Sequence, residues 1–319
     1  MISATAPGKI ILFGEHAVVY GRPALAIPVL QVGATVTIDM DPTAPPGGNW
    51  LDHITIDAPE IGRKGTLASY HPRQGPDPLA TLILNVCTAL SVSSPPSMHI
   101  RISSSIPVAS GLGSGAAVSV ALIRALAVSL GKTLPIEQVS MLAYEIEKLY
   151  HGTPSGIDNT VITYAQPVYF RKDHPIETFP VGKPFTLVIA DSGKSAATRA
   201  SVGDVRKQWQ AEPERLERIF SSIAEIVQLA RQSIQAGDVK NLGKLMNRNH
   251  TLLQDLTVSS HELDRLTAAA LTSGAMGAKL SGGGRGGNMI ALVQPDAAPG
   301  LAAALRSAGA RGTIITRVT

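Results

Sequence analysis

A glycine-rich segment, IPVASGLGSGAA at 106–117, leads directly into a long apolar run. Glycines let backbone N–H groups approach an anion closely, and the positive end of a following helix stabilises its negative charge. The segment therefore predicts a phosphate-binding turn. It is not a P-loop, because no Gly-Lys-Ser or Gly-Lys-Thr follows at the required spacing, and it does not fit G-x-G-x-x-G. Taken alone, it is also compatible with a tight strand-to-helix connection that binds nothing.

Carboxylates stand on either side of a Gly/Pro turn in the segment EIEKLYHGTPSGIDN at 145–159. Glu145 and Glu147 are two residues apart and cannot share one helix face, so at most one of them should point into a site. A magnesium–nucleotide site needs one or two carboxylates, and phosphoryl transfer to an alcohol needs one near the hydroxyl. The segment can supply both, unless Glu147 is a surface charge and Asp158 a helix cap.

A third glycine-rich segment, KLSGGGRGGN at 279–288, precedes an apolar strand pattern. Glycine loses more backbone entropy on folding than any other residue, so five glycines within ten residues need a reason. Close approach of a ligand would provide one, and a plain linker is the alternative.

The elements that must position these segments follow from hydrophobic periodicity and from Gly and Pro breakers. In the first half we expect strands at 9–13, 32–40, 53–56 and 99–102, helices at 111–130 and 135–150, and loops at 41–50 and 62–78. In the second half we expect strands at 185–190, 289–293 and 313–317 and helices at 213–235, 238–256, 260–273 and 298–308. Near residue 184 the pattern of expected elements changes, and a strand followed by long helices begins. We therefore predict an α+β protein with lobes at 1–183 and 184–319.

Composition narrows the function classes. The 319 residues are 44% hydrophobic and 16% charged, and no window offers the run of about 18 apolar residues that a membrane helix needs. The first residues lack a basic and apolar signal segment, so we expect a cytoplasmic protein. The formal charge is +4, but Lys and Arg are scattered, which does not indicate nucleic-acid binding. The single cysteine, Cys87, lies in an apolar run and is predicted to be a core thiol.

The three segments occur in an order and spacing that resemble the GHMP kinase superfamily, named for galactokinase, homoserine kinase, mevalonate kinase and phosphomevalonate kinase. The opening APGKIILFGEHAVVYGRPALA at 6–26, the stretch HGTPSGIDN at 151–159 and NRNH at 247–250 are most similar to the mevalonate kinase branch. This resemblance implies a two-lobed GHMP kinase fold, with a mixed-sheet N-terminal lobe and a ferredoxin-like α/β C-terminal lobe.

The resemblance also implies roles for individual residues. Asp158 would be the catalytic carboxylate facing the substrate hydroxyl, and Lys9 would stabilise the developing oxyanion and the transferred phosphoryl group. Glu147, with Ser114, would hold magnesium. The residues expected at the ATP phosphates are Pro107, Ser110, Gly111, Leu112, Gly113, Ser114, Gly115 and Ala116. The residues expected at the acceptor substrate are Glu15, His16, Thr198, Ser281 and Gly282.

Two positions depart from the family pattern. The family usually has Gly-Leu-Gly-Ser-Ser-Ala where this chain has GLGSGA, so Gly115 replaces a serine whose hydroxyl usually contacts magnesium. Ser114, a backbone group or a water must then stand in, or the metal is held more weakly. Arg285 interrupts the third glycine-rich segment, where it either reaches a phosphate or faces solvent.

The activity that the resemblance implies is transfer of the γ-phosphoryl group of ATP, with Mg²⁺, to the C5 hydroxyl of mevalonate by a homodimeric enzyme. A related kinase acting on phosphomevalonate, on another mevalonate hydroxyl or on a sugar is the enzymatic alternative. A non-catalytic metabolite sensor is a second alternative, supported only by Gly115. Retention of Lys9, Glu147 and Asp158 together argues against a sensor, which needs no acid, base and metal ligand in concert.

Overall fold

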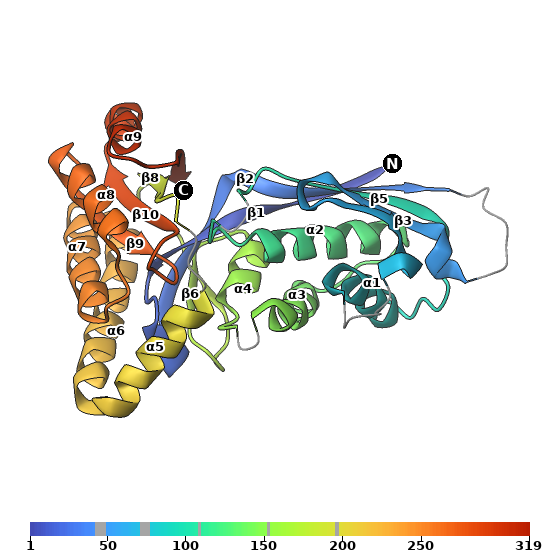
Figure 1. Ribbon diagram of the computed structural model, residues 1–319, viewed down its shortest axis with the longest axis horizontal. Coiled ribbons are helices and arrows are strands. Elements are labelled where there is room, and N and C mark those ends of the chain that lie inside the picture. Colours follow the sequence, from blue (N-terminus) through green and yellow to red (C-terminus); the bar gives the residue numbers. More distant parts are fainter. Residues whose placement is uncertain (42–48, 71–76, 108–109, 152–153, 195–197) are drawn as a thin grey trace. The chain divides into compact units, whose positions relative to one another are not determined.

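The computed structural model describes residues 1–41, 49–70, 77–107, 110–151, 154–194 and 198–319 (Figure 1). The chain packs as two compact units, and it passes from one to the other more than once. The first unit comprises Met1–Gly8, Val32–Val108 and Gly113–Ala165, and the second comprises Lys9–Gln31, Ala109–Leu112 and Gln166–Thr319. The predicted lobes at 1–183 and 184–319 have other bounds and remain a prediction.

The first unit is built on a mixed sheet, as predicted. Its strands follow the order β4-β3-β5-β2, with β1 paired to β2, and the β3–β5 pair is parallel whereas the β3–β4 and β2–β5 pairs are antiparallel. Helices α1 to α4 lie along one face of this sheet in Figure 1. The elements, of which β1 and β2 continue into the second unit, are β1 (Ile2–Phe13), β2 (Ala24–Met40), β3 (Ile54–Ala58), β4 (Arg63–Thr66), β5 (Met98–Ser104), α1 (Pro78–Ala89), α2 (Ser114–Ser129), α3 (Ile136–His151) and α4 (Ile157–Tyr164).

Periodicity explains which side chains this unit buries. In β5 the alternate residues Met98, Ile100 and Ile102 are buried, as expected for a strand with one face on the core. Helix α2 is apolar nearly all round, and it correspondingly packs against α1, α3 and α4. Cys87 is buried on α1, and burial raises the pKa of its thiol to about 11, which confirms the predicted core role.

The second unit contains a four-stranded antiparallel sheet with the order β11-β8-β10-β9. Numbered along the chain, this order is 4-1-3-2 with helices between the first and second and between the third and fourth strands, which confirms the ferredoxin-like prediction. Helices α7 and α8 pack on β9, and α9 packs on β8 and β11. The elements are β6 (Val168–Phe170), β7 (Glu177–Thr178), β8 (Phe185–Asp191), β9 (Gly277–Ser281), β10 (Asn288–Val293), β11 (Gly312–Val318), α5 (Thr198–Ala211), α6 (Pro213–Ala236), α7 (Val239–Asp255), α8 (His261–Thr272) and α9 (Ala298–Ser307).

The loop predicted at 62–78 is partly wrong. Its residues Arg63–Thr66 form β4, which pairs with β3 in the register Thr55↔Thr66 to Ala58↔Arg63, and a 3-10 turn, Leu67–Tyr70, follows. The composition of this short polar segment does not favour a strand. It is a strand because its backbone pairs with the neighbouring strand. Most of the loop predicted at 41–50, and residues 71–76 of the second loop, lie outside the described residues. Within the described ranges, no helix has the length and apolar character needed to cross a membrane.

Candidate active site

Lys9 lies on β1 in the second unit, and only 5% of its surface is exposed. Lysine is almost never fully buried without a function or a partner, so this burial singles the residue out. Its backbone amide donates to the carbonyl of Leu112 at 2.9 Å. The strand that carries the predicted catalytic lysine is therefore attached directly to the predicted phosphate-binding turn.

The loop after β1 turns sharply at His16. The residue has φ 62° and ψ −50°, and the amide of Ala17 donates to the carbonyl of Glu15 at 2.7 Å. This is a γ-turn with positive φ, a rare and strained conformation for a residue other than glycine. The imidazole Nε2 donates to the carbonyl of Gly283 at 3.0 Å, and Nδ1 is buried with no partner among the described residues. Burial lowers the pKa of His16 to about 4, so the ring is neutral near pH 7.

Glu15 forms a fully buried ion pair with Lys279 of β9, and neither side chain has any exposed surface. The Nδ2 atom of Asn249, on α7, donates to the other carboxylate oxygen of Glu15 at 3.4 Å. Burial pulls the pKa of the Lys279 ammonium below its ordinary value, and the adjacent carboxylate opposes that pull. The structure thus places two of the predicted acceptor-site residues, Glu15 and His16, against β9 and the glycine-rich segment that follows it.

Three further predicted acceptor-site residues lie in the same unit. Ser281, at the end of β9, donates from Oγ to the carbonyl of Ile11 on β1 at 2.7 Å. Thr198, the first residue of α5, is exposed and packs so closely on Gly283 that a Cβ there would lie 2.9 Å from its Oγ1. Gly282 has open space where a side chain would project.

The protein's own packing explains part of the third glycine-rich segment. Gly284 has φ 72°, and a Cβ at this position would overlap the carbonyl oxygen of Val258. Close approach of a ligand is therefore not needed to account for this glycine. The side chain of Arg285 forms an ion pair with Asp204 at 2.5 Å and donates from Nε to the carbonyl of Thr257. Arg285 is therefore bound to the protein, and its side chain remains partly exposed to solvent.

The predicted phosphate-binding turn ends at the start of α2. Gly113, at φ 79° and ψ 33°, is the N-cap residue, and no side chain caps the helix. The first amides of an α-helix have no intrahelical acceptor, so those of Ser114, Gly115 and Ala116 are oriented to bind an anion. Next to them along the chain, the buried Oγ of Ser110 has no partner among the described residues. Pro107 is exposed, and residues 108–109 lie outside the described part.

Glu147 and Glu145 on α3 behave as their spacing predicts. Glu147 is buried, with 4% of its surface exposed, whereas Glu145 is exposed and bound to Lys148 at 2.7 Å. A Cβ on Gly115 would lie 3.3 Å from Oε1 of Glu147, so a serine at 115 would bring its hydroxyl beside this carboxylate. Glu147 is therefore not the exposed surface charge of the alternative interpretation, and the position of the missing serine faces it.

This region fits a nucleotide-bound magnesium ion. Among the described residues, no three or more His, Cys, Asp or Glu side chains are grouped so that they could hold a metal alone. Mg²⁺ commonly takes one or two carboxylates from a protein and its other ligands from phosphates and waters. Glu147 would supply one buried carboxylate to such an ion. It lies in the same unit as the open start of α2, where phosphates would supply further ligands.

Asp158 is the second residue of α4 in the first unit and is half-buried. Gly156 holds the N-cap position, so the alternative in which Asp158 is the N-cap residue is wrong. The positive end of the α4 dipole stabilises a carboxylate in this first turn. The preceding residues 152–153 lie outside the described part.

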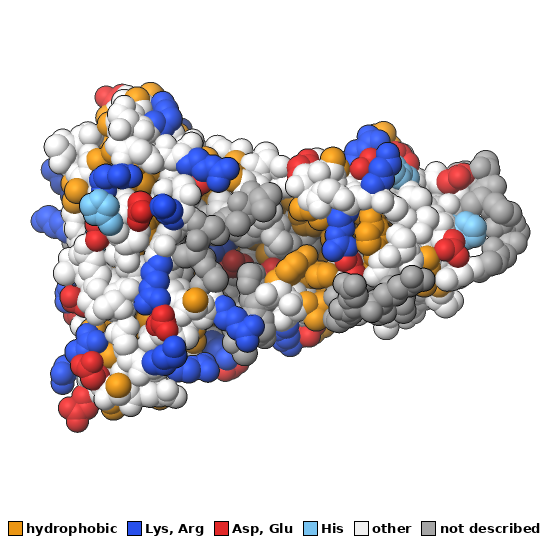
Figure 2. Space-filling view, viewed as in Figure 1, with side chains coloured by type: hydrophobic (Ala, Val, Ile, Leu, Met, Phe, Trp, Pro, Cys, Tyr) orange, Lys and Arg blue, Asp and Glu red, His pale blue; other side chains and the backbone are white. Residues whose placement is uncertain are grey.

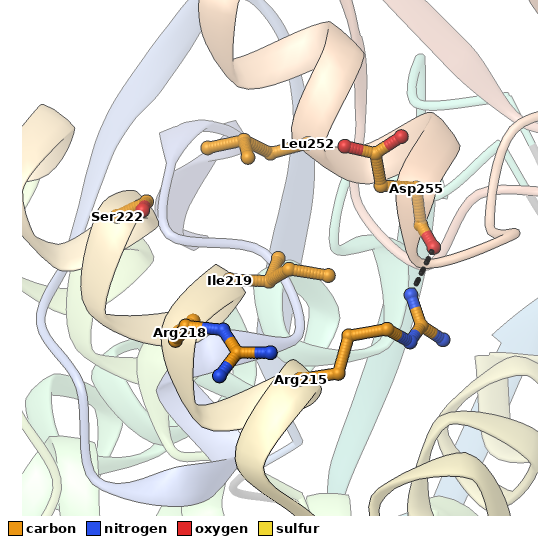
Figure 3. A pocket seen from close by; sticks show the side chains of 6 residues that line it. All are labelled: Arg215, Arg218, Ile219, Ser222, Leu252 and Asp255. Carbon is orange, nitrogen blue, oxygen red and sulfur yellow. Dashed lines mark hydrogen bonds between the residues drawn. The ribbon is translucent and has the colours of Figure 1, made fainter. Parts of the chain in front are cut away.

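A pocket of about 310 Å³ on the second unit contains none of these residues (Figure 3). Its lining comes from α6 and α7 and includes Arg215, Arg218 and Asp255. Arg215 is already engaged, because it donates to the carbonyl of Asp255 at 3.3 Å and to the carboxylate of Glu212 at 2.9 Å. On the face shown in Figure 2, basic and acidic side chains of this unit are interspersed. The pocket is therefore not the active-site candidate.

Sequence reasoning gave no individual role to the first and last residues of the third glycine-rich segment, Lys279 and Asn288. Lys279 pairs with Glu15, and the side-chain amide of Asn288 donates to the carbonyl of Ser110 in the predicted phosphate-binding turn. The available signal was a lysine inside the buried strand sequence GAKLS, because a buried lysine needs a partner charge.

Two parts of the chain match known protein families. Residues 81–166 match the family described as GHMP kinases N terminal domain, and residues 230–311 match GHMP kinases C terminal. A mevalonate kinase of Thermococcus sibiricus is 35% identical over 333 residues, an alignment covering 100% of this chain and 96% of the relative.

Solved structures agree with this match. The L. major mevalonate kinase in complex with R-mevalonate is 30% identical, with a TM-score of 0.82 over 99% of this chain and 95% of that chain. The Methanococcus jannaschii mevalonate kinase is 26% identical, with a TM-score of 0.84 over 99% and 98% of the two chains. The similarity thus extends through both compact units.

Proposed function

The chain belongs to the GHMP kinases, and we propose that it transfers the γ-phosphoryl group of ATP to the C5 hydroxyl of mevalonate, giving 5-phosphomevalonate. The observation that carries this proposal is the full-length similarity to mevalonate kinases, one of them solved with R-mevalonate bound. Burial of Lys9 and Glu147 supports catalysis over a sensor role, because burying charged groups is costly and a sensor has no need of them.

The start of α2 would bind the phosphates of ATP. Its first-turn amides and the positive end of its dipole stabilise negative charge, and Gly113 lets the chain enter the helix without a side chain in the way. Glu147 and Ser114 would hold Mg²⁺, which when bound neutralises charge on the phosphate oxygens. With Gly115 in place of the family's serine, one hydroxyl fewer is available to the metal.

Asp158 would accept the proton of the C5 hydroxyl as the oxygen attacks, and Lys9 would stabilise the charge on the transferred group. Phosphoryl transfer depends chiefly on positioning and charge stabilisation, so fixed side chains on regular elements suit it. Lys9 on β1 and Asp158 on α4 both meet that requirement. His16, neutral near pH 7, would offer mevalonate a hydrogen-bonding imidazole without a second positive charge. A cytoplasmic location and a homodimer remain part of the proposal.

The test is release of ADP from Mg-ATP in the presence of mevalonate, phosphomevalonate, galactose or homoserine. Saturable turnover on mevalonate alone is expected. The Asp158→Asn protein should lose about 10²- to 10⁴-fold in kcat, the usual range for a general base, while still binding ATP. Asp173→Asn is the matched control, since Asp173 is an exposed carboxylate and its loss should leave turnover unchanged.

Turnover confined to another substrate of the panel would retain a GHMP kinase reaction and reject mevalonate as the acceptor. Near-normal activity of Asp158→Asn would reject the assigned base. ATP binding without turnover on any of the four substrates would favour the sensor alternative.

A further inference from the structure

The γ-turn at His16 needs something to hold it. A residue other than glycine at φ 62° and ψ −50° is strained, and such strain persists only where the surrounding structure maintains it. Local backbone hydrogen bonds at the turn run from the amide of Ala17 to the carbonyl of Glu15, from Val18 to Gly14 and from Val19 to His16. Side-chain contacts with residues elsewhere in the second unit add to these local hydrogen bonds.

Two side chains hold the residue before the turn. Lys279, in the middle of β9, forms the ion pair with Glu15, and Asn249 of α7 donates to the same carboxylate. The ammonium of Lys279 also donates to the carbonyl of Leu280 and lies 5.9 Å from the centre of the Phe13 ring at the end of β1. Lys279 thus contacts the chain on both sides of Gly14, where β1 ends and the loop begins.

The same strand also leads to the partner of the His16 ring. Nε2 of His16 donates to Gly283, two residues after β9 ends at Ser281, and Ser281 itself bonds Ile11 of β1. Glu15 and His16 are therefore attached through their side chains to residues 279 and 283 of one short segment. Any displacement of Glu15 from Lys279 would move the turn away from the carbonyl that orients the imidazole.

Stability alone gives no reason for this pair. Removing two charges from water is costly, and replacing a buried ion pair by apolar residues of similar volume is often neutral or stabilising. With no exposed surface on either side chain, the pair belongs to that class. Its location beside a strained turn that carries a predicted acceptor-site residue points to a role in positioning.

We propose that Lys279 is a positioning residue, whose ammonium fixes the Glu15 carboxylate and thereby holds the His16 turn in the geometry that receives mevalonate. The inference rests on the proposed function for the identity of the substrate. It assigns Lys279 no contact with either substrate, and it makes acceptor binding, not ATP binding, depend on the ion pair.

The experiment compares Lys279→Met, which keeps the length of the side chain and removes its charge, with the double variant Glu15→Gln/Lys279→Met. The single variant leaves a buried carboxylate unpaired, whereas the double variant removes both charges and should recover thermal stability. If the pair positions the turn, both variants should lose about 100-fold in kcat/KM for mevalonate, the scale of a misplacement of about 1 Å, with KM for ATP unchanged.

Leu305→Ala is the matched control. Leu305 is a fully buried side chain on α9 in the same unit, so its truncation lowers stability without touching the loop after β1. This variant should lose melting temperature and keep the wild-type KM for mevalonate. A double variant with wild-type kinetic constants would overturn the proposal. So would a Leu305→Ala protein that loses kcat/KM for mevalonate to the same extent, with KM for ATP unchanged. Failure of the double variant to fold would also count against it, because the pair would then serve the fold itself.

A second readout needs no substrate. Hydrogen exchange of a peptide covering residues 13–21 should be faster in both Lys279 variants than in wild type, and unchanged in Leu305→Ala at a temperature where all are folded. Equal exchange in all four proteins would refute the role of Lys279 in holding the turn. If the wild-type protein does not phosphorylate mevalonate, the proposed function is rejected. The exchange measurement would still test whether Lys279 holds the turn.

Discussion

Acidification should destabilise the protein through His16. Its imidazole is buried, and Nε2 donates to the carbonyl of Gly283. A proton on Nδ1 would have no hydrogen-bond acceptor among the described residues. Burial, with a smaller contribution from the positive charge of Arg285, lowers the pKa of His16 from 6.5 to about 4 in the folded protein. The hydrogen bond to Gly283 opposes this shift, and the unfolded chain keeps the ordinary value. Between these two values the unfolded state binds more protons, so stability is complete above pH 6.5 and falls as the pH falls.

The size of the effect follows from the shift. Each pKa unit corresponds to about 1.4 kcal/mol, so lowering the pH from about 7.5 to about 4.5 should remove about 2.5 kcal/mol of unfolding free energy through this residue. Other groups titrate in the same range, so the quantity to measure is the difference between wild type and His16→Gln. Glutamine can place an amide nitrogen near the position of Nε2, and it does not titrate.

The assay is urea unfolding at constant ionic strength across that pH range. Fluorescence of Trp209 on α5 reports the unit that contains His16, and Trp50 is replaced by phenylalanine in every protein so that only this signal is read. His174→Gln is the control, since that imidazole is exposed and its loss should leave the curve parallel to wild type. Parallel curves for wild type and His16→Gln would refute the reasoning, because His16 would then titrate alike in both states.

Three further outcomes are expected. Gly115→Ser should lower the Mg²⁺ concentration for half-maximal activity by up to about tenfold, the scale of one hydrogen bond beside Glu147, and an unchanged or higher requirement would contradict it. Cys87, whose pKa is raised to about 11, should react with iodoacetamide near neutral pH only when the protein unfolds, so prompt labelling of the native protein would contradict its burial. Arg285→Met should cost less than about 1 kcal/mol of stability, because its ion pair with Asp204 is partly exposed; a loss above about 2 kcal/mol in urea unfolding would contradict this.

Local patterns in the sequence determined much of this protein. The apolar run after the glycines at 111–113 predicted α2 and its open start, and the two-residue spacing of Glu145 and Glu147 predicted that only one would point inward. Both results depend on helix periodicity, which neighbouring residues set among themselves. Apolar runs located β8, β10 and β11 of the ferredoxin-like sheet for the same reason, whereas no strand was predicted at β9.

Only the tertiary structure decided the rest. The polar segment Arg63–Thr66 is a strand because β3 offers it backbone partners, and Gly284 is required because the carbonyl of Val258 occupies the space of a side chain. The pair of Glu15 and Lys279 joins residues 264 positions apart. No local pattern specifies such a contact, because two charges lose their water only when packing brings both into the same interior, and that packing is a property of the whole unit.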